Sequence, residues 1–204
     1  MLKRPFKNSP NNGSDRSDVD LISDIADGDE AAFSVLMTRH KGPLFRFILR
    51  YVGMRADAED LLQDTFFSVY AKAASYDPAW KSSTWIYRIA LNKCRDHGRR
   101  QRFRRMFAFS SGPTDPVGQA ATIPEPADES PSVESLVMHR EELSRLTAAL
   151  QDLPHNMRSA LVLHTVEGRS QSECAEILGV SRKSVEMLVY RARKALRQHL
   201  GYED

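Results

Sequence analysis

The sequence predicts an all-α protein of two small helical domains joined by a flexible linker rich in proline and acidic residues. Apolar residues recur at helical spacing in both halves of the chain, and strand signals are sparse. Between these halves, residues 107–134 hold five of the ten prolines and five acidic residues, without helical or strand periodicity. We therefore divide the chain into a disordered tail at 1–17, a first helical domain at 18–106, the linker at 107–134 and a second helical domain at 135–204.

Composition is typical of a soluble globular protein. The 204 residues are 41% hydrophobic and 27% charged. Two cysteines cannot form the disulfide framework of a secreted miniprotein. The N-terminal residues contain no apolar core of signal-peptide length, and no apolar stretch is long enough to span a bilayer. We expect a cytoplasmic protein with reduced thiols and no direct membrane insertion.

Helical spacing assigns the elements of the first domain. Apolar residues in segment 17–53 follow this spacing, with Gly28 and Asp29 as a break and cap. In segment 57–73, Ala and larger apolar side chains fall on one face at 100° per residue. A further helix is expected from Thr84 to about Arg100, after a loop that contains aromatic residues.

The second domain is expected to contain four helices. The first ends near Leu153, and the second runs from His155 to Glu167. A short helix follows, then a turn at Gly179 that needs a positive φ, then a long final helix with Ser181 as N-cap. This arrangement is typical of a helix-turn-helix, which places its last helix in the major groove of DNA.

The outward face of the final helix is basic, with one acidic residue. Lys and Arg side chains can bind guanine edges or phosphates, and Glu186 could accept a hydrogen bond from cytosine N4. The acid therefore favours base recognition over plain charge attraction. The alternative is a solvated helix face in which Glu186 pairs with Tyr190 or Arg182.

A second basic segment ends the first domain. The net charge of the chain is only +2, but seven Lys or Arg and one acid lie between Lys93 and Arg105. So many like charges together favour contact with phosphates over a simple solvated helix end.

These segments together resemble a bacterial RNA polymerase sigma factor of the extracytoplasmic-function (ECF) group of the sigma-70 family. The motifs follow the family's order and spacing, with a flexible join, and this ensemble is far more specific than a lone helix-turn-helix. The resemblance implies an alternative sigma factor that binds core RNA polymerase and directs promoter recognition and transcription initiation. The matching stretches are "GDEAAF" (28–33), "DAEDLLQDTF" (57–66), "TWIYRIALNKCRDHGRR" (84–100), "LPHNMRSALVLHTVEG" (153–168), "AEILGVS" (175–181) and "YRARKALR" (190–197).

The resemblance implies that the first domain, which is similar to sigma region 2, binds core RNA polymerase. Its second motif resembles the helix that docks on the β′ clamp helices, and the β subunit is a further expected contact. Phe67, an aromatic on the polar face, is costly to expose in a monomer but useful as an interface anchor. The alternative is that a helix of its own domain covers Phe67. The expected polymerase-binding residues are Asp57, Asp60, Gln63, Asp64 and Phe67.

The same domain resembles the element that recognises and opens the −10 promoter region. Asn and basic side chains suit base edges and backbone, and aromatic side chains in the loop could stack on a flipped base. Trp85, by contrast, is expected in the core. The expected −10 residues are Tyr76, Trp80, Arg88, Asn92, Lys93, Arg99 and Arg100.

The second domain is similar to sigma region 4, which reads the −35 element. Here the sequence departs from the family, since "KSVEML" at 183–188 replaces a run that is often basic or small, and Cys174 replaces an aliphatic residue. Cysteine preserves the packing, but the family's −35 consensus does not transfer to this chain. The expected −35 residues are Arg182, Lys183, Ser184, Glu186, Met187, Tyr190 and Arg191.

The sequence gives no sign of catalysis, a cofactor or a metal. Cys94 and His97 lie one helical turn apart, but a structural zinc site needs four ligands. The resemblance instead implies macromolecular partners: core polymerase, promoter DNA and an anti-sigma factor. Two alternatives stay open, namely an autonomous helix-turn-helix regulator and a sigma-like decoy that sequesters an anti-sigma factor.

Overall fold

The computed structural model describes residues 16–108 and 133–201, and within these ranges the chain forms helices and no strand. Most of the expected tail and of the expected linker lies outside the described residues. The first domain comprises α1 (Asp18–Ala26), α2 (Glu30–Val52), α3 (Arg55–Lys72), the 3₁₀ turn η1 (Ala73–Ser75) and α4 (Ser82–Ala108). The second comprises α5 (Val133–Asp152), α6 (His155–Leu161), the π-helical turn η2 (Val162–Val166), α7 (Gln171–Leu178) and α8 (Arg182–Leu200).

The break between α1 and α2 lies where the sequence predicts it. Gly28 takes a φ of +94°, in the region that glycine adopts without steric cost. The Asp29 carboxylate then accepts hydrogen bonds from the backbone N–H groups of Ala31 (2.8 Å) and Ala32 (3.1 Å). This cap satisfies donors that the first turn of α2 leaves without partners.

Helix α2 continues through Pro43 to Val52. Proline removes one backbone donor and crowds the preceding turn. Packing compensates, since α2 contacts α1, α3 and α4 and buries Leu36, Leu44, Phe47 and Ile48 completely. Tertiary burial therefore overrides the local cost of proline in this helix.

Helix α4 also extends beyond its expected end near Arg100 and reaches Ala108. Asp57 of α3 lies against this extension: its Oδ2 accepts a hydrogen bond from the Gln101 side chain at 3.2 Å and lies 3.3 Å from His97 Nε2. These contacts hold α4 beside α3 past the last buried apolar residue of α4, Cys94.

The second domain contains the expected helix-turn-helix. Ser170 and Glu173 form a reciprocal capping box at the start of α7, and Gly179 ends the helix at a φ of +68°. The Ser181 side chain caps α8. The helix expected from His155 to Glu167 is instead divided, because after α6 the Glu167 N–H donates to the Val162 carbonyl, five residues back.

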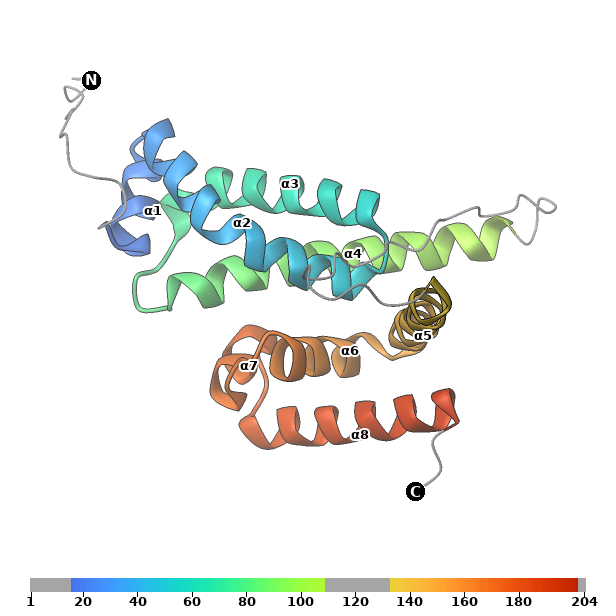
Figure 1. The fold of residues 1–204 in the computed structure, drawn as a ribbon. Coiled ribbons are helices and arrows are strands. Elements are labelled where there is room, and N and C mark those ends of the chain that lie inside the picture. The colour runs from blue at the N-terminus through green and yellow to red at the C-terminus, as the bar shows by residue number, and fades with distance from the viewer. Residues whose placement is uncertain (1–15, 109–132, 202–204) are drawn as a thin grey trace, which may run out of the picture.

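The two domains pack directly against each other, which the sequence did not predict. Helix α4 contacts α7, while α2 contacts α5 and η2. Figure 1 shows α6 and α7 lying between α4 on one side and α8 on the other. The chain is therefore a closed pair of domains, in which α8 is the helix of the second domain farthest from the first.

Candidate nucleic-acid and polymerase interfaces

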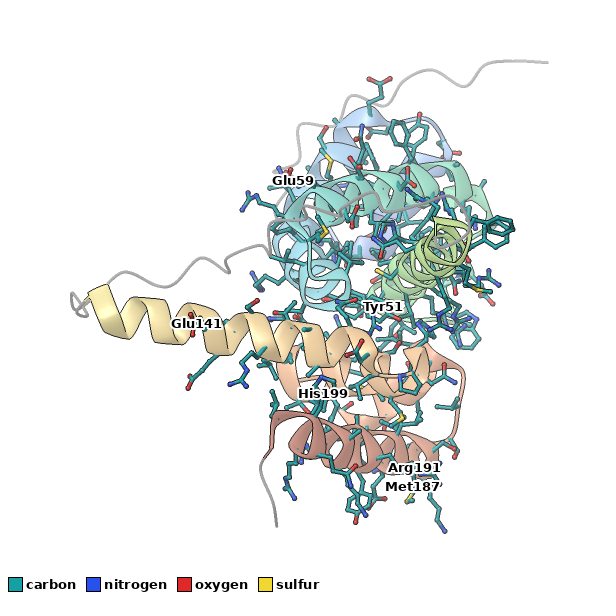
Figure 2. All side chains as sticks on the ribbon, turned by 90° about the vertical axis from the view of Figure 1, so that its right-hand side faces the viewer. Tyr51, Glu59, Glu141, Met187, Arg191 and His199 are labelled. Atoms are coloured by element: carbon teal, nitrogen blue, oxygen red, sulfur yellow. The ribbon has the colours of Figure 1, made fainter. Side chains whose placement is uncertain are left out.

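Helix α8 presents all seven expected −35 residues on one exposed face. Its buried face consists of Val185, Val189 and Ala192, which pack on the rest of the second domain. Figure 2 shows the labelled Met187 and Arg191 side chains directed away from the body of the protein. The exposed set is Arg182, Lys183, Ser184, Glu186, Met187, Tyr190 and Arg191.

Glu186 lies on the rim of a cavity of about 330 Å³ that is also lined by basic side chains of α8 and by His164 and Gln171. Within residues 16–108 and 133–201, its carboxylate forms no ion pair or hydrogen bond. The alternative pairing with Tyr190 or Arg182 is therefore not formed, and the carboxylate stays available to an external donor.

The expected −10 residues of α4 differ in their accessibility. Asn92, Arg99 and Arg100 are exposed, although Arg99 also donates to Asp96 at 2.6 Å. The Lys93 ammonium lies 4.0 Å from the Asp64 carboxylate of α3, which keeps this lysine close to its own domain. Asn92 and the two arginines thus form the accessible part of this face.

The loop before α4 forms a compact aromatic cluster. The Tyr76 hydroxyl donates to the Trp80 carbonyl at 2.6 Å, and the Tyr76 ring lies 5.0 Å from that of Trp85. Burial raises the pKa of Tyr76 above its usual value, so its hydroxyl stays protonated. Trp85 packs on the core, as expected, while Trp80 is 43% exposed beneath the Arg88 guanidinium at 4.5 Å.

The second domain covers Arg88. The Arg88 Nε–H donates to the backbone carbonyl of Glu176 in α7 at 2.9 Å. The Glu176 carboxylate in turn accepts a hydrogen bond from the Thr84 hydroxyl of α4 at 3.3 Å. One expected DNA-binding residue is therefore already bonded to the helix-turn-helix. No local pattern in the sequence predicts this contact between the two domains.

Further charged and aromatic side chains cross the same junction. Arg50 of α2 forms an ion pair with Glu167 at 3.0 Å, and the Glu167 side chain is only 8% exposed. The Arg169 guanidinium lies 3.8 Å from the centre of the Tyr87 ring. Because such partly buried pairs are poorly screened by solvent, they hold the two domains more firmly than surface pairs would.

His155 links three parts of this junction. Arg95 of α4 donates from Nε to His155 Nε2 at 2.8 Å, so Nδ1 carries the ring proton and faces the Tyr51 hydroxyl. Figure 2 places Tyr51 where the two domains meet. Burial and the charges of Arg95 and Arg158 lower the pKa of His155 to about 4.

The polymerase-binding residues expected on α3 are mostly exposed. Phe67 is 66% exposed, so the alternative that its own domain covers it is wrong for the described residues. Asp60, Gln63 and Asp64 are exposed around it. Asp57 differs, because its carboxylate is half-buried against α4 and supports the helix pair.

A groove of about 1040 Å³ runs between α2 and α3 beside Phe67. Its α2 wall was not among the residues expected from the sequence. Gln63 and Phe67 line one side, while Phe33, Met37 and Phe45 line the other. The spacing of Phe33 and Met37, one turn apart in segment 17–53, was the available signal.

Two kinds of site are absent from the described residues. No helix there is long and apolar enough to cross a membrane. No group of three or more His, Cys, Asp or Glu side chains in the same residues is placed to hold a metal ion.

Family models match both domains. Residues 36–104 match sigma-70 region 2, and residues 143–196 match sigma-70 region 4. The chain is 34% identical over 176 residues to the RNA polymerase sigma factor CnrH of Cupriavidus metallidurans, covering 86% of this chain and 90% of that protein. It is 32% identical over 188 residues to the ECF RNA polymerase sigma factor SigM of Mycobacterium tuberculosis, covering 92% and 87%.

Solved structures agree with these matches. The structure of CnrH in complex with the cytosolic domain of CnrY has a TM-score of 0.64 and 28% identity, covering 92% of this chain and 99% of that one. The sigma factor RpoE of Bartonella quintana shares the fold, with a TM-score of 0.60 at 23% identity over 84% and 98% of the two chains. The chain therefore belongs to the extracytoplasmic-function group of the sigma-70 family of RNA polymerase sigma factors.

Proposed function

We propose that the first domain, residues 18–106, docks on core RNA polymerase and reads the −10 element, while α8 of the second domain, residues 135–204, reads the −35 element. The observation that carries this division is the α8 surface, where one face is buried and the opposite face exposes every expected −35 side chain. An exposed helix face with basic, hydroxyl and acidic side chains matches the donor and acceptor pattern of a major groove.

Polymerase docking is assigned to the exposed part of α3. Phe67 supplies an apolar anchor, and Asp60, Gln63 and Asp64 surround it with polar groups. This pattern, a central aromatic with a polar rim, is typical of residues that dominate binding energy at protein interfaces. The docking partners are the β′ clamp helices, with the β subunit as a further contact.

The −10 residues are assigned to α4 and its preceding loop. Asn92, Arg99 and Arg100 are accessible in the closed chain, and Trp80 can stack on a base once Arg88 is released. Full use of this face requires α7 to leave Arg88. Core polymerase supplies the free energy for this opening if it binds the separated domains more tightly than the closed pair.

Regulation by a protein partner is also proposed. The similar sigma factor CnrH was solved with the cytosolic domain of CnrY bound to it. A partner of this kind, acting as an anti-sigma factor, would hold the chain away from polymerase. We place this action in the cytoplasm, where core polymerase is found, and assign the chain no catalytic step or cofactor of its own.

A gel-shift assay with and without core polymerase tests the proposal. The expected result is weak, poorly selective DNA binding by the free chain and promoter-specific binding when core enzyme is added. Tight sequence-specific binding by the free chain, unchanged by core enzyme, would instead identify an autonomous regulator. Charge reversal of Arg99 and Arg100 without effect on promoter-dependent transcription would support the decoy alternative.

A further inference from the structure

A single carboxylate links three helices at the end of the first domain that carries the loop before α4. Asp18, the first residue of α1, accepts a hydrogen bond from His40 Nε2 of α2 at 2.7 Å. The same Oδ2 atom accepts from the Ser82 hydroxyl, at the start of α4, at 3.2 Å. The other carboxylate oxygen accepts from the Arg39 guanidinium of α2. Asp18 thus joins α1, α2 and α4 at one point.

The charge of this carboxylate is stabilised by its partners. Burial alone would raise the pKa of Asp18, but hydrogen bonds from His40 and Arg39 outweigh burial and keep this pKa below its usual value. The side chain of Asp18 is only 16% exposed, and that of His40 only 11%. A charge that is largely withdrawn from water is costly without its partners, so these groups fix one another's positions.

The loop of residues 76–81 lies against α1 at both of its ends. Helix α1 packs on η1, which leads into the loop, and Asp18 bonds to Ser82, which follows it. Figure 1 shows α1 at the end of the domain where this loop joins α3 to α4. Leu21 and Ile22 are completely buried and anchor α1 in the core. The loop therefore begins and ends against one well-anchored helix.

The interior of the loop is closed by hydrogen bonds of its own. The Ala79 N–H donates to the Asp77 carboxylate at 2.9 Å, and the Trp80 N–H donates to the Asp77 carbonyl at 3.0 Å. The Tyr76 hydroxyl donates to the Trp80 carbonyl at 2.6 Å. Burial, and then the charge of Asp18, raises the pKa of Tyr76 and so keeps this donor protonated. Because the loop is closed on itself, fixing its ends also fixes the Trp80 ring.

Asp18 could instead serve α1 alone, since an acidic residue in the first turn stabilises the N-terminus of a helix. Asp20 lies in the same turn, and its carboxylate accepts from the Ser17 hydroxyl at 2.7 Å. Its bond stays within α1 and its cap, whereas the bonds of Asp18 reach α2 and α4. Bonds to other helices are not needed at a helix end, so they indicate a role for Asp18 beyond α1.

We propose that Asp18 is a positioning residue, which holds loop 76–81 so that the Trp80 ring is oriented for stacking on a base of the −10 element. Asp18 acts through Ser82 and does not itself contact DNA. This inference rests on the proposed function, which assigns Trp80 to the −10 element. A loop that is already ordered loses less conformational entropy when it binds DNA, so its affinity for DNA is higher.

Hydrogen exchange of the free full-length chain tests the positioning directly. S82A removes the hydroxyl that donates to Asp18 but leaves the other partners of Asp18 in place, so the fold should be retained. Backbone amides of residues 76–81 should exchange about fivefold faster in S82A, while S82T, which keeps the hydroxyl, should restore the original rate. D18N should show the same increase. D20N, the matched control in the same turn of α1, should exchange as the unmodified chain does.

Promoter binding by the chain with core polymerase tests the consequence for DNA. S82A should bind a promoter fragment with a single-stranded −10 element about fivefold more weakly than the unmodified chain. In a W80A background, S82A should cause no further loss, because the contact acts through the Trp80 ring. A general loss of structure would instead add to the effect of W80A.

Unchanged loop exchange in both S82A and D18N would overturn the proposal. Equal losses of promoter affinity on adding S82A to the unmodified chain and to W80A would also overturn it. If W80A itself bound the promoter normally, the assignment of Trp80 to the −10 element would fail, and the role of Asp18 with it. Faster loop exchange in S82A would distinguish that failure of the proposed function from a failure of the positioning contact.

Discussion

His155 joins the two domains through both ring nitrogens, and its protonation state matters for stability. A proton added at Nε2 would face the Arg95 donor and would place a third positive charge beside Arg95 and Arg158. The lowered pKa, about 4 against a usual 6.5, is the consequence of this position.

This residue predicts a pH dependence with a defined sign. Between about pH 6.5 and pH 4 the unfolded chain binds a proton that the folded chain resists, so stability is complete above this window and decreases as the pH falls through it. Allowing for solvent screening at a half-buried site, we expect about 1 kcal/mol lost from pH 7 to pH 5. Urea unfolding at the two pH values measures it.

The variant H155Q is the control for that measurement, because glutamine does not titrate. Between pH 7 and pH 5, the free energy of unfolding of H155Q should fall less than that of the unmodified chain. The difference should equal the contribution of about 1 kcal/mol assigned to His155. Identical pH profiles for the two proteins would show that the imidazole does not carry the effect.

Phe66 and Phe67 are neighbours in sequence with opposite environments, at 5% and 66% exposure. F66A should lose about 3 kcal/mol of stability, because it leaves a cavity in the core. F67A should unfold as the unmodified chain does but should bind core polymerase about thirtyfold more weakly, the loss typical of an interface anchor. Chemical unfolding measures the stability of each variant, and a titration with core polymerase measures its binding affinity.

If F67A bound core polymerase normally, the assignment of the docking face to α3 would be wrong. The sequence anticipated the exposure of Phe67, because it breaks an otherwise polar helical face. It could not anticipate that Asp57 is held against α4, since that contact joins residues in two helices whose mutual packing no local pattern specifies.

At the scale of helices, the sequence predicted helix boundaries correctly where a capping residue and the apolar periodicity indicate the same position. The break at Gly28 and the turn at Gly179 were found because a positive φ and a capping side chain each have a sequence signature. Helix α2 continues through Pro43 because burial outweighs the local cost of proline. The extension of α4 beyond Arg100 depends on contacts with α3, such as that of Gln101 with Asp57, which the basic sequence of this segment does not predict.

Helix α8 predicts a specific change in promoter preference. Selection of −35 sequences with the chain bound to core polymerase should show a cytosine preference at one position, and E186A should remove it. The expected discrimination is about 1–3 kcal/mol, the value of a good contact between a side chain and a base. E186A should leave the base preference at the other positions of the −35 element unchanged.

R191A provides the comparison for that experiment. If Arg191 contacts a phosphate, R191A should weaken binding to all sequences alike. If E186A and the unmodified chain selected identical −35 sequences, Glu186 would be a solvated residue of the helix surface and not a base reader.

At the scale of the whole molecule, the closed pair of domains is the feature that sequence could not supply. Its contacts join side chains about a hundred positions apart, such as Arg50 with Glu167 and Tyr51 with His155. Isolated charges and rings of this kind look like ordinary surface residues in the sequence. Only the packing of α4 on α7 and of α2 on η2 brings them together.

The ion pair between Arg50 and Glu167 offers a test of closure in solution. R50E places two carboxylates at the junction and should shift the free chain toward separated domains, raising its radius of gyration in small-angle scattering. The charge swap R50E/E167R should restore the compact value. Equal radii for all three proteins would mean that this pair does not hold the domains.

The most direct test is run-off transcription by purified core RNA polymerase, with and without this chain, over a library of random promoters. The account predicts transcripts that depend on the chain and that share two recurring elements, one for each domain. If the chain gave core enzyme no ability to initiate at any sequence in the library, the account would be contradicted.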